Sequence, residues 1–316
     1  MTRRDFLLRT GAAVSLGFLG QRALRAQTPP PAAQPVPVKP PTPVTEFKPL
    51  RRNTGIFTGR GGTIGWLVNA DAAVTVDTQF PDTAAICLAG LPGRNGRLLD
   101  AAIDSHHHFD HTAGNKVFKA SARMLVAHKN VPKLQLEAFE RNPQTGEPVL
   151  PDTLFADVWR KDVGDEVVSA QHFGPAHTAG DIVVYFERAN VAHVGDLVSN
   201  RIYPVLDRPG GCSARGWIKA LEEVAATYPK DVQLIFGHGR QQFGVTGTLA
   251  DVAAQRDFLA ALVAHVEGEM KAGKTRDEIV RLGNLPGFPD YFADEKTSRL
   301  PGNLGAVYDE LSGAAT

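Results

Sequence analysis

The stretch that decides the fold is Asp104-Ser105-His106-His107-His108-Phe109-Asp110-His111, which holds four of the ten histidines of the chain. It follows an apolar segment, residues 98–103, typical of a buried strand, and it precedes residues 112–119, which can form a helix. Alternate residues of an extended chain point the same way, so His106 and His108 can face one point while His107 faces away. Asp110 and His111, at the turn into the helix, can reach a second point nearby. Imidazole and carboxylate groups are ligands of zinc and its first-row neighbours, so this loop predicts a metal site.

Three further strand-to-loop junctions end in a residue of the same kind. His177 lies in the loop of residues 174–181, Asp196 follows the apolar segment 191–194, and His238 follows the apolar segment 232–236. A surface histidine tract, the alternative interpretation of residues 106–111, predicts no such residues at other strand ends. The pattern therefore favours a metal centre built from several loops.

In order and spacing, these residues resemble the five-motif signature of the metallo-β-lactamase fold superfamily over about residues 55–240. The resemblance implies an α/β fold, a four-layer αββα sandwich with a two-metal site at one edge of its sheets. Asp77, which closes the apolar segment 73–76, matches the first motif and is interpreted as a carboxylate that orients a metal ligand. By the same resemblance, the first metal is held by His106, His108 and His177, the second by Asp110, His111 and His238, and Asp196 bridges both.

The ligand set predicts two Zn²⁺ ions, although iron or manganese also fits the spacing. A hydroxide held between two metals can attack an ester, thioester or lactone carbonyl, with Asp110 orienting the nucleophile and passing a proton to the leaving group. The common metallo-β-lactamase subclass has a cysteine near the position of Asp196, and this chain has none there. The sequence therefore favours the glyoxalase-II-like, lactonase-like and sulfatase-like branches. Two alternatives stay open: a β-lactamase of the cysteine-free subclass and a mononuclear iron oxygenase of the same fold.

The N-terminal part of the chain predicts export. Residues 1–26 resemble a twin-arginine signal, with Arg3 and Arg4 ahead of an apolar run at residues 11–20 and a plausible cleavage point at Ala26. An apolar run of this length is too short to span a bilayer, so we expect a periplasmic protein without a stable membrane anchor after cleavage. Residues 27–49 hold nine of the 22 prolines and are predicted to be an extended linker, with a docking motif as the alternative.

Residues 50–316 are predicted to form one domain, because 316 residues with 43% hydrophobic content suffice for a full core. The 34 basic residues equal the 34 acidic ones, which argues against a nucleic-acid partner and leaves a small-molecule substrate. The sequence carries no signal for the oligomeric state. Cys87 and Cys212 are expected to be free thiols.

Two loops are expected at the rim of the site. Residues 141–165 are polar and interrupted by proline, and residues 197–212 leave one predicted ligand and return to the sheet. In the second loop, Arg201, Tyr203 and Arg208 are candidates for binding an anionic or carbonyl-bearing substrate, with a salt-bridged surface loop as the equal alternative. His172 and His193 alternate with apolar neighbours outside the motifs and are expected to be structural. The chain beyond residue 282, rich in glycine and proline, is expected to be irregular.

Overall fold

The computed structural model describes residues 44–291 and 299–314 of the chain. The chain divides into two units, Met1–Pro41 and Thr42–Thr316, and the described residues belong to the second. The predicted signal segment and most of the predicted linker lie outside the described residues. Within the described part, no helix has the length and apolarity needed to cross a membrane.

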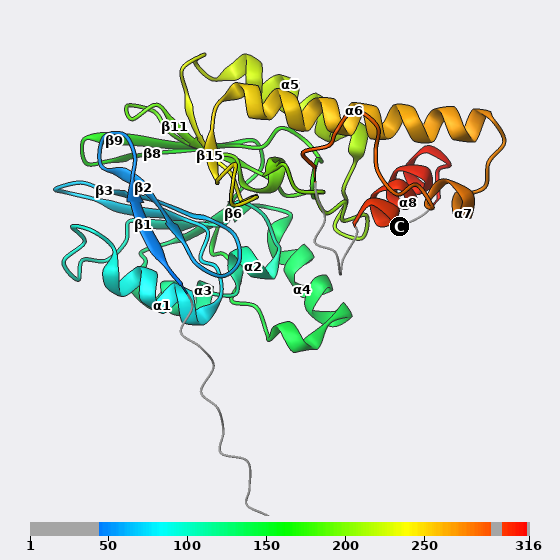
Figure 1. Cartoon of the computed structure of the whole chain (residues 1–316). Coiled ribbons are helices and arrows are strands. Elements are labelled where there is room, and N and C mark those ends of the chain that lie inside the picture. Colours follow the sequence, from blue (N-terminus) through cyan, green and yellow to red (C-terminus); the bar gives the residue numbers. More distant parts are fainter. Residues whose placement is uncertain (1–43, 292–298, 315–316) are drawn as a thin grey trace, which may run out of the picture. The chain divides into compact units, whose positions relative to one another are not determined.

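Two mixed β-sheets pack face to face in the middle of the second unit (Figure 1). The first sheet has seven strands in sequence order: β1 Glu46–Pro49, β2 Thr54–Thr58, β3 Ile64–Val68, β4 Ala73–Val76, β5 Ala101–Ile103, β6 Leu125–His128 and β7 Thr153–Phe155. The second has six, in the order β15 Thr246–Gly247, β13 Gln233–Ile235, β11 Val191–His193, β10 Val183–Phe186, β9 Glu166–Gln171 and β8 Val158–Val163. Strands β12 Ser199–Asn200 and β14 His238–Gly239 form a separate two-stranded parallel sheet.

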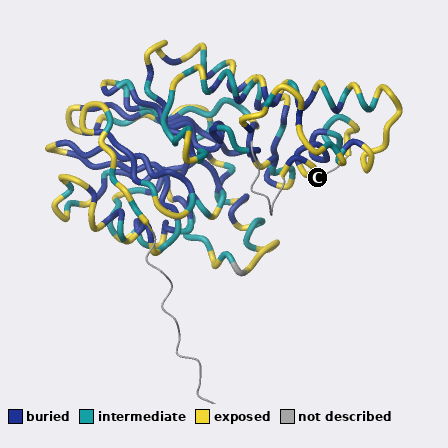
Figure 2. Tube along the Cα trace, in the orientation of Figure 1, coloured by how far each residue is buried: buried dark blue, intermediate teal, exposed yellow. Residues whose placement is uncertain are grey.

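Helices cover the outer faces of both sheets. On the first sheet lie α1 Pro81–Gly90, α2 Phe109–Thr112, α3 Asn115–Phe118 and α4 Val131–Arg141, and beside the second lie α5 Ala214–Thr227 and α6 Leu249–Lys271 (Figure 1). Helix α8 Leu300–Leu311 packs against α6, and α7 Arg276–Ile279 packs against α8. The strands form the buried centre, and exposed residues gather in the loops and on the outer helix faces (Figure 2). Three apolar clusters fill the spaces between these four layers. The αββα sandwich predicted from the sequence is therefore confirmed.

Strand direction brings the predicted site residues to one edge of the sheets. Strands β4 and β5 are parallel, so Asp77 and the loop of residues 104–111 leave neighbouring strands at the same end. In the second sheet β11 and β13 are also parallel, which places Asp196 and His238 beyond neighbouring strand ends. Loops at the carboxyl ends of parallel strands are where many α/β proteins build their sites.

Four predicted boundaries need correction. Strand β1 begins at Glu46, inside the segment assigned to the linker, and Pro49 is tolerated because β1 is an edge strand. The predicted rim loop 141–165 contains both β7 and β8. The predicted irregular end contains α8, whose Pro301 lies in the first turn, where proline is compatible with a helix. In place of the single helix predicted at residues 112–119, the chain forms two short helices, α2 at residues 109–112 and α3 at residues 115–118.

The break between α2 and α3 has a local cause. The backbone N–H of Gly114 donates to the carbonyl of Gln79, and a Cβ on Gly114 would lie 2.1 Å from the carbonyl oxygen of Thr78. Gly114, which follows the histidine loop, therefore packs directly against residues 78–79, which follow β4. Cys87 and Cys212 are both buried and unpaired, as expected.

Candidate metal centre

The first group of ligand-type side chains comprises His106, His108 and His177. Their ring nitrogens converge: His106 Nε2 and His177 Nε2 lie 3.1 and 3.0 Å from His108 Nδ1. His106 and His177 are each 1% exposed. Three imidazole nitrogens pointing at one small volume are the donor set expected around a single cation.

The second group comprises Asp110, His111 and His238. His238 Nε2 lies 3.2 Å from His111 Nε2 and 3.1 Å from Asp110 Oδ2. Asp110 and His111 come from the first turn of α2, and His238 from β14 of the other half of the sandwich. The two halves of the fold therefore meet at this group.

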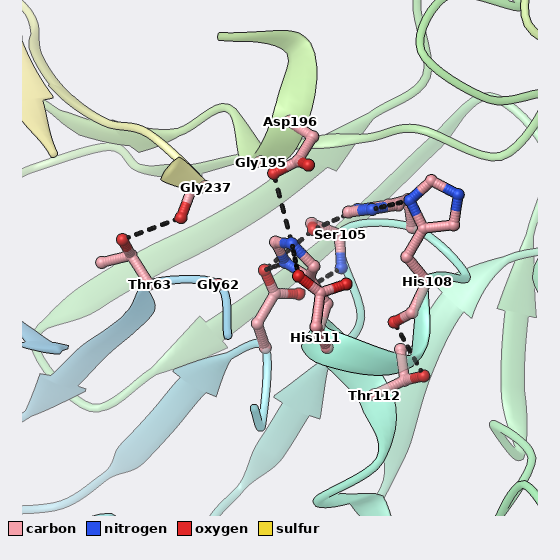
Figure 3. A network of polar contacts seen from close by, with 12 residues as sticks. Gly62, Thr63, Ser105, His108, His111, Thr112, Gly195, Asp196 and Gly237 are labelled. Carbon is pink, nitrogen blue, oxygen red and sulfur yellow. Dashed lines mark hydrogen bonds and ion pairs between the residues drawn. The ribbon is translucent and has the colours of Figure 1, made fainter. Parts of the chain in front are cut away.

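Asp196 lies between the two groups, on the short turn of residues 195–197 after β11. Its Oδ1 is 3.2 Å from His111 Nε2, and its Oδ2 is 3.5 Å from His238 Nε2 and 3.6 Å from His177 Nε2. Asp196 and His111 point toward one another (Figure 3). One carboxylate thus reaches both groups, as a bridging ligand must.

Glycine at position 237 leaves room for this carboxylate. A Cβ on Gly237 would lie 1.9 Å from Asp196 Oδ1, and Gly237 donates its N–H to the carbonyl of Gly195. The Gly237 carbonyl in turn accepts the N–H and hydroxyl of Thr63. Any larger residue at position 237 would push Asp196 out of its position between the groups.

Asp77 occupies the place expected of a carboxylate that orients a ligand. Its Oδ2 lies 2.7 Å from His111 Nδ1, and its two oxygens accept the N–H and hydroxyl of Ser105 at 2.8 and 2.9 Å. The Ser105 hydroxyl also contacts His106 Nδ1 at 3.0 Å. Asp77 and Ser105 therefore fix the far side of one ring in each group, which leaves Nε2 of both rings for a metal.

Asp207, which the sequence analysis did not single out, plays the same part for His108. Its Oδ2 lies 2.9 Å from His108 Nε2 and 3.3 Å from His107 Nε2, and its Oδ1 accepts the N–H of Gly210. Asp207 is the only acidic residue of the loop 197–212, and this is the one feature of the sequence that could have identified it as a partner of a ligand. The same loop provides the carbonyl of Val205, which lies 2.8 Å from His177 Nδ1.

The three predicted substrate residues of that loop lie elsewhere. Tyr203 is buried, with its ring against Phe258, and Arg208 donates to the carbonyl of Cys212 in its own turn. The guanidinium of Arg201 is 3.7 Å from a carboxylate oxygen of Asp251. The loop does lie over the predicted ligands. It contacts their rings through the Asp207 carboxylate and the Val205 carbonyl, and not through the three residues predicted to bind substrate, so the rim assignment is corrected.

The remaining histidines of the described chain that the sequence analysis weighed lie outside the two groups. His193 is buried, and its Nε2 contacts the Thr63 carbonyl at 2.9 Å. His172 stacks on His128 with ring centroids 4.0 Å apart and contacts the Asp181 carbonyl through Nδ1. His107, beside Asp207, is turned away from the convergence point of the first group.

Burial and charge make the two groups suitable for cations. Burial, together with neighbouring imidazoles, lowers the pKa of His177 to about 3 and holds that of His106 well below its usual range, so both rings are neutral donors. Burial opposes ionisation of Asp196, yet His238 and His111 hold its pKa well below the usual range. Asp196 Oδ1 is buried without a hydrogen-bond partner among the described residues. Burial lowers the pKa of His111, whose Nε2 lies 3.2 Å from this oxygen, but the carboxylates of Asp196, Asp110 and Asp77 raise that pKa well above its usual range. A buried carboxylate oxygen without a hydrogen bond, set among imidazoles and further carboxylates, fits a site for positive ions.

A cleft with a volume of about 560 Å³ gives access to these groups. Asp110, His238, Asp196 and His108 line it, together with Phe80, Phe109, Ile202, Val205 and Arg299. Arg299, whose guanidinium donates to the Tyr203 carbonyl, is a rim cation that sequence reasoning missed. Neither periodicity nor a motif marks it.

The chain is similar in sequence and in fold to known proteins. The sequence profile described as the metallo-beta-lactamase superfamily matches residues 57–238. A hydroxyacylglutathione hydrolase of Brucella anthropi is 28% identical over 143 residues, 45% of this chain and 49% of the relative, so the chain spans about half the length of the curated relatives it matches.

Among solved structures, a double mutant of the sec-alkyl sulfatase PisA1, an enzyme from Pseudomonas sp., superposes with a TM-score of 0.70 at 20% identity, covering 84% of this chain and 50% of that one. A metallo-beta-lactamase from Pontibacter korlensis superposes with a TM-score of 0.57 at 18% identity, covering 69% and 99%. At these identities the structural likeness concerns the fold. The profile match, which spans all the ligand-type residues described above, shows that the chain belongs to the metallo-beta-lactamase superfamily.

Proposed function

We propose that the protein is a dinuclear metal-dependent hydrolase that acts on an ester or thioester carbonyl. The observation that carries the proposal is Asp196, whose two oxygens lie within 3.6 Å of ring nitrogens from both ligand groups. In this assignment His106, His108 and His177 hold one Zn²⁺, Asp110, His111 and His238 hold the other, and Asp196 bridges them. Bound metals would lower the pKa of a water and polarise the substrate carbonyl.

The chain's own residues account for the proton transfer. The Asp110 carboxylate lines the cleft, and His111 and His238 hold its pKa below the usual range although burial raises it, so the group is ionised. It can accept a proton from the attacking water as the new carbon–oxygen bond forms. When the bond to the leaving oxygen or sulfur breaks, Asp110 can return that proton to the alkoxide or thiolate. No serine or cysteine nucleophile is needed.

The substrate class rests on two supports. The first is that this chain has no cysteine near Asp196, whereas the common β-lactamase subclass has a cysteine near that position. The second is that the curated relatives are named for the hydrolysis of hydroxyacylglutathione. Lactone carbonyls react in the same way and belong to the same proposal.

A substrate panel tests the proposal. It comprises S-lactoylglutathione, an acyl-homoserine lactone, a secondary alkyl sulfate and nitrocefin, each with metal-loaded protein, chelator-treated protein and the Asp110→Asn variant. Metal-dependent turnover of the thioester or lactone, abolished in Asp110→Asn, supports the proposal. Turnover of nitrocefin alone would replace it with the β-lactamase alternative. One iron per chain with oxygen consumption would replace it with the oxygenase alternative.

We further propose that the protein is exported to the periplasm through its twin-arginine segment. Replacing Arg3 and Arg4 together with lysine should leave the protein in the cytoplasmic fraction, because the paired arginines carry the resemblance to the signal. Arg22→Lys, outside the pair, is the matched control and should be exported normally. Immunoblots of cell fractions measure the outcome, and normal export of the paired variant would contradict the proposal.

A further inference from the structure

A second cavity of about 270 Å³ adjoins the metal cleft. It lies among α2, α3, α4 and residues 145–149, and it shares Phe80, His108 and Phe109 with the cleft. The rings of Phe80 and Phe109 meet edge to face with centroids 5.5 Å apart. His108, a candidate metal ligand, lies where the two cavities join. The central part of a molecule that occupies both cavities would therefore lie next to the metal centre.

The walls of this cavity are mainly apolar. Phe80, Phe109, Ala138, Phe139 and Val149 line it, and the exposed side chains of Lys116 and Glu147 border it. An engineered cavity of about 150 Å³ is large enough to bind benzene, so this one has room for a phenyl ring or a medium alkyl chain. An apolar wall of this kind would bind such a group and exclude a strongly charged one.

Gln135 is a buried polar residue of this wall, which also includes His107, His108 and Thr112. It is 3% exposed, and neither its amide nitrogen nor its amide oxygen has a hydrogen-bond partner among the described residues. It precedes Ala138 and Phe139 by three and four positions on α4, which places all three on one face of the helix, and all three line the cavity. A buried amide without partners is costly to a fold, which calls for an explanation.

We propose that this cavity binds the acyl group of the substrate and that Gln135 hydrogen-bonds a hydroxyl or amide group carried by that acyl chain. The inference rests on the hydrolase function proposed above and adds its substrate class, an ester or thioester of a medium-length apolar acid with a polar substituent. The leaving group then lies in the wider cleft, near Arg299. The carbonyl carbon lies between them, beside His108 and Asp110.

Three variants test the cavity. Ala138→Trp fills it, Gln135→Leu keeps its shape but removes the amide, and Leu136→Trp adds the same indole on the same helix at a position that is 42% exposed and outside the cavity. Thermal unfolding shows that each variant folds. Gln135→Leu should be at least as stable as the wild type, because its amide has no partner to lose, whereas a structural role for the amide would make this variant less stable.

The kinetic test compares 4-nitrophenyl acetate, hexanoate and 6-hydroxyhexanoate. Ala138→Trp should lower kcat/KM at least tenfold for both six-carbon esters and change it less than twofold for acetate. Gln135→Leu should lower kcat/KM at least fivefold for the hydroxylated ester and leave or raise it for hexanoate. Leu136→Trp should match the wild type throughout. Equal changes for all three esters, or none, would overturn the inference while leaving the hydrolase function intact.

A binding measurement separates failure of the cavity from failure of the proposed function. Hexanamide, a neutral probe, is titrated into protein with ¹³C-labelled alanine methyl groups, and the signal of Ala113, a cavity-lining residue, is followed by NMR. A saturable shift in the wild type and in Leu136→Trp, absent in Ala138→Trp, supports the cavity even if no ester is turned over. Absence of the shift in the wild type would refute it.

Discussion

The two ligand groups differ in how firmly the fold holds them. In the first group, His106 and His177 are buried away from the cleft, and all three rings are anchored on their far side, by Ser105, Asp207 and the Val205 carbonyl. In the second group, His111 alone is anchored in this way by a described residue, and the side chains of Asp110 and His238 are 26% and 31% exposed and line the cleft. The first group resembles a closed structural site, and the second an open catalytic one. We infer that the fold holds the first metal more firmly than the second, although His108 of the first group also lines the cleft.

The largest expected effect comes from removing the charge that joins the groups. Asp196→Asn keeps the shape of the side chain but no longer offsets the repulsion between two cations, so turnover should fall by roughly 100-fold or more. The variant should retain one metal per chain, because the first group keeps its three histidines. Zinc content and turnover on a substrate found with the panel measure the outcome. Two metals with near-normal turnover would refute the bridging role.

Two outer carboxylates allow the groups to be weakened one at a time. Asp207→Asn should weaken the first metal by about 10- to 100-fold, because it loosens His108, and Asp77→Asn should weaken the second by a similar factor through His111. Asp77 is buried and also holds Ser105, so thermal unfolding of both metal-free variants serves as the control. If both variants lost the same metal, the assignment of one carboxylate to each group would be wrong.

The smallest effect is expected for the histidine that belongs to neither group. His107→Ala should retain two metals and keep turnover within roughly tenfold, because the ring of His107 lies beside the ring of His108 and its Nε2 faces the carboxylate of Asp207, whose own loss should cost about 10- to 100-fold. His108→Ala, one position along, should lose a metal. Metal analysis of the pair measures the contrast, and equal metal loss in the two variants would show that the register of the loop has been misassigned.

The sequence predicted those site residues whose positions follow from the local pattern around them. Each main ligand candidate follows an apolar strand or lies in a glycine-containing turn, and parallel strands bring such positions to one edge. Asp207 and Arg299 obey no such rule, because their positions depend on how a loop and a distant helix pack onto the sandwich. Tyr203 shows the same limit. The composition of its loop suggested a place at the substrate rim, but tertiary packing buries the side chain.

Two elements were missed because composition favoured the opposite interpretation. Strand β1 lies in a proline-rich segment, yet Phe47 packs on Phe57 with ring centroids 4.7 Å apart, and that contact holds the strand at the sheet edge. Helix α8 contains Gly305, which lowers helix propensity. A Cβ there would lie 2.5 Å from the Arg276 guanidinium, so glycine permits the close packing of α7 and α8. In both cases contacts distant in sequence outweighed a local preference.

The most direct test of this account is a zinc titration of metal-free protein against a chromophoric chelator. The wild type should bind two equivalents with dissociation constants at least tenfold apart, the tighter assigned to the first group by its survival in Asp196→Asn and its weakening in Asp207→Asn. A protein that binds a single equivalent, or whose tighter site is the one weakened by Asp77→Asn, would contradict the division into a closed first site and an open second one.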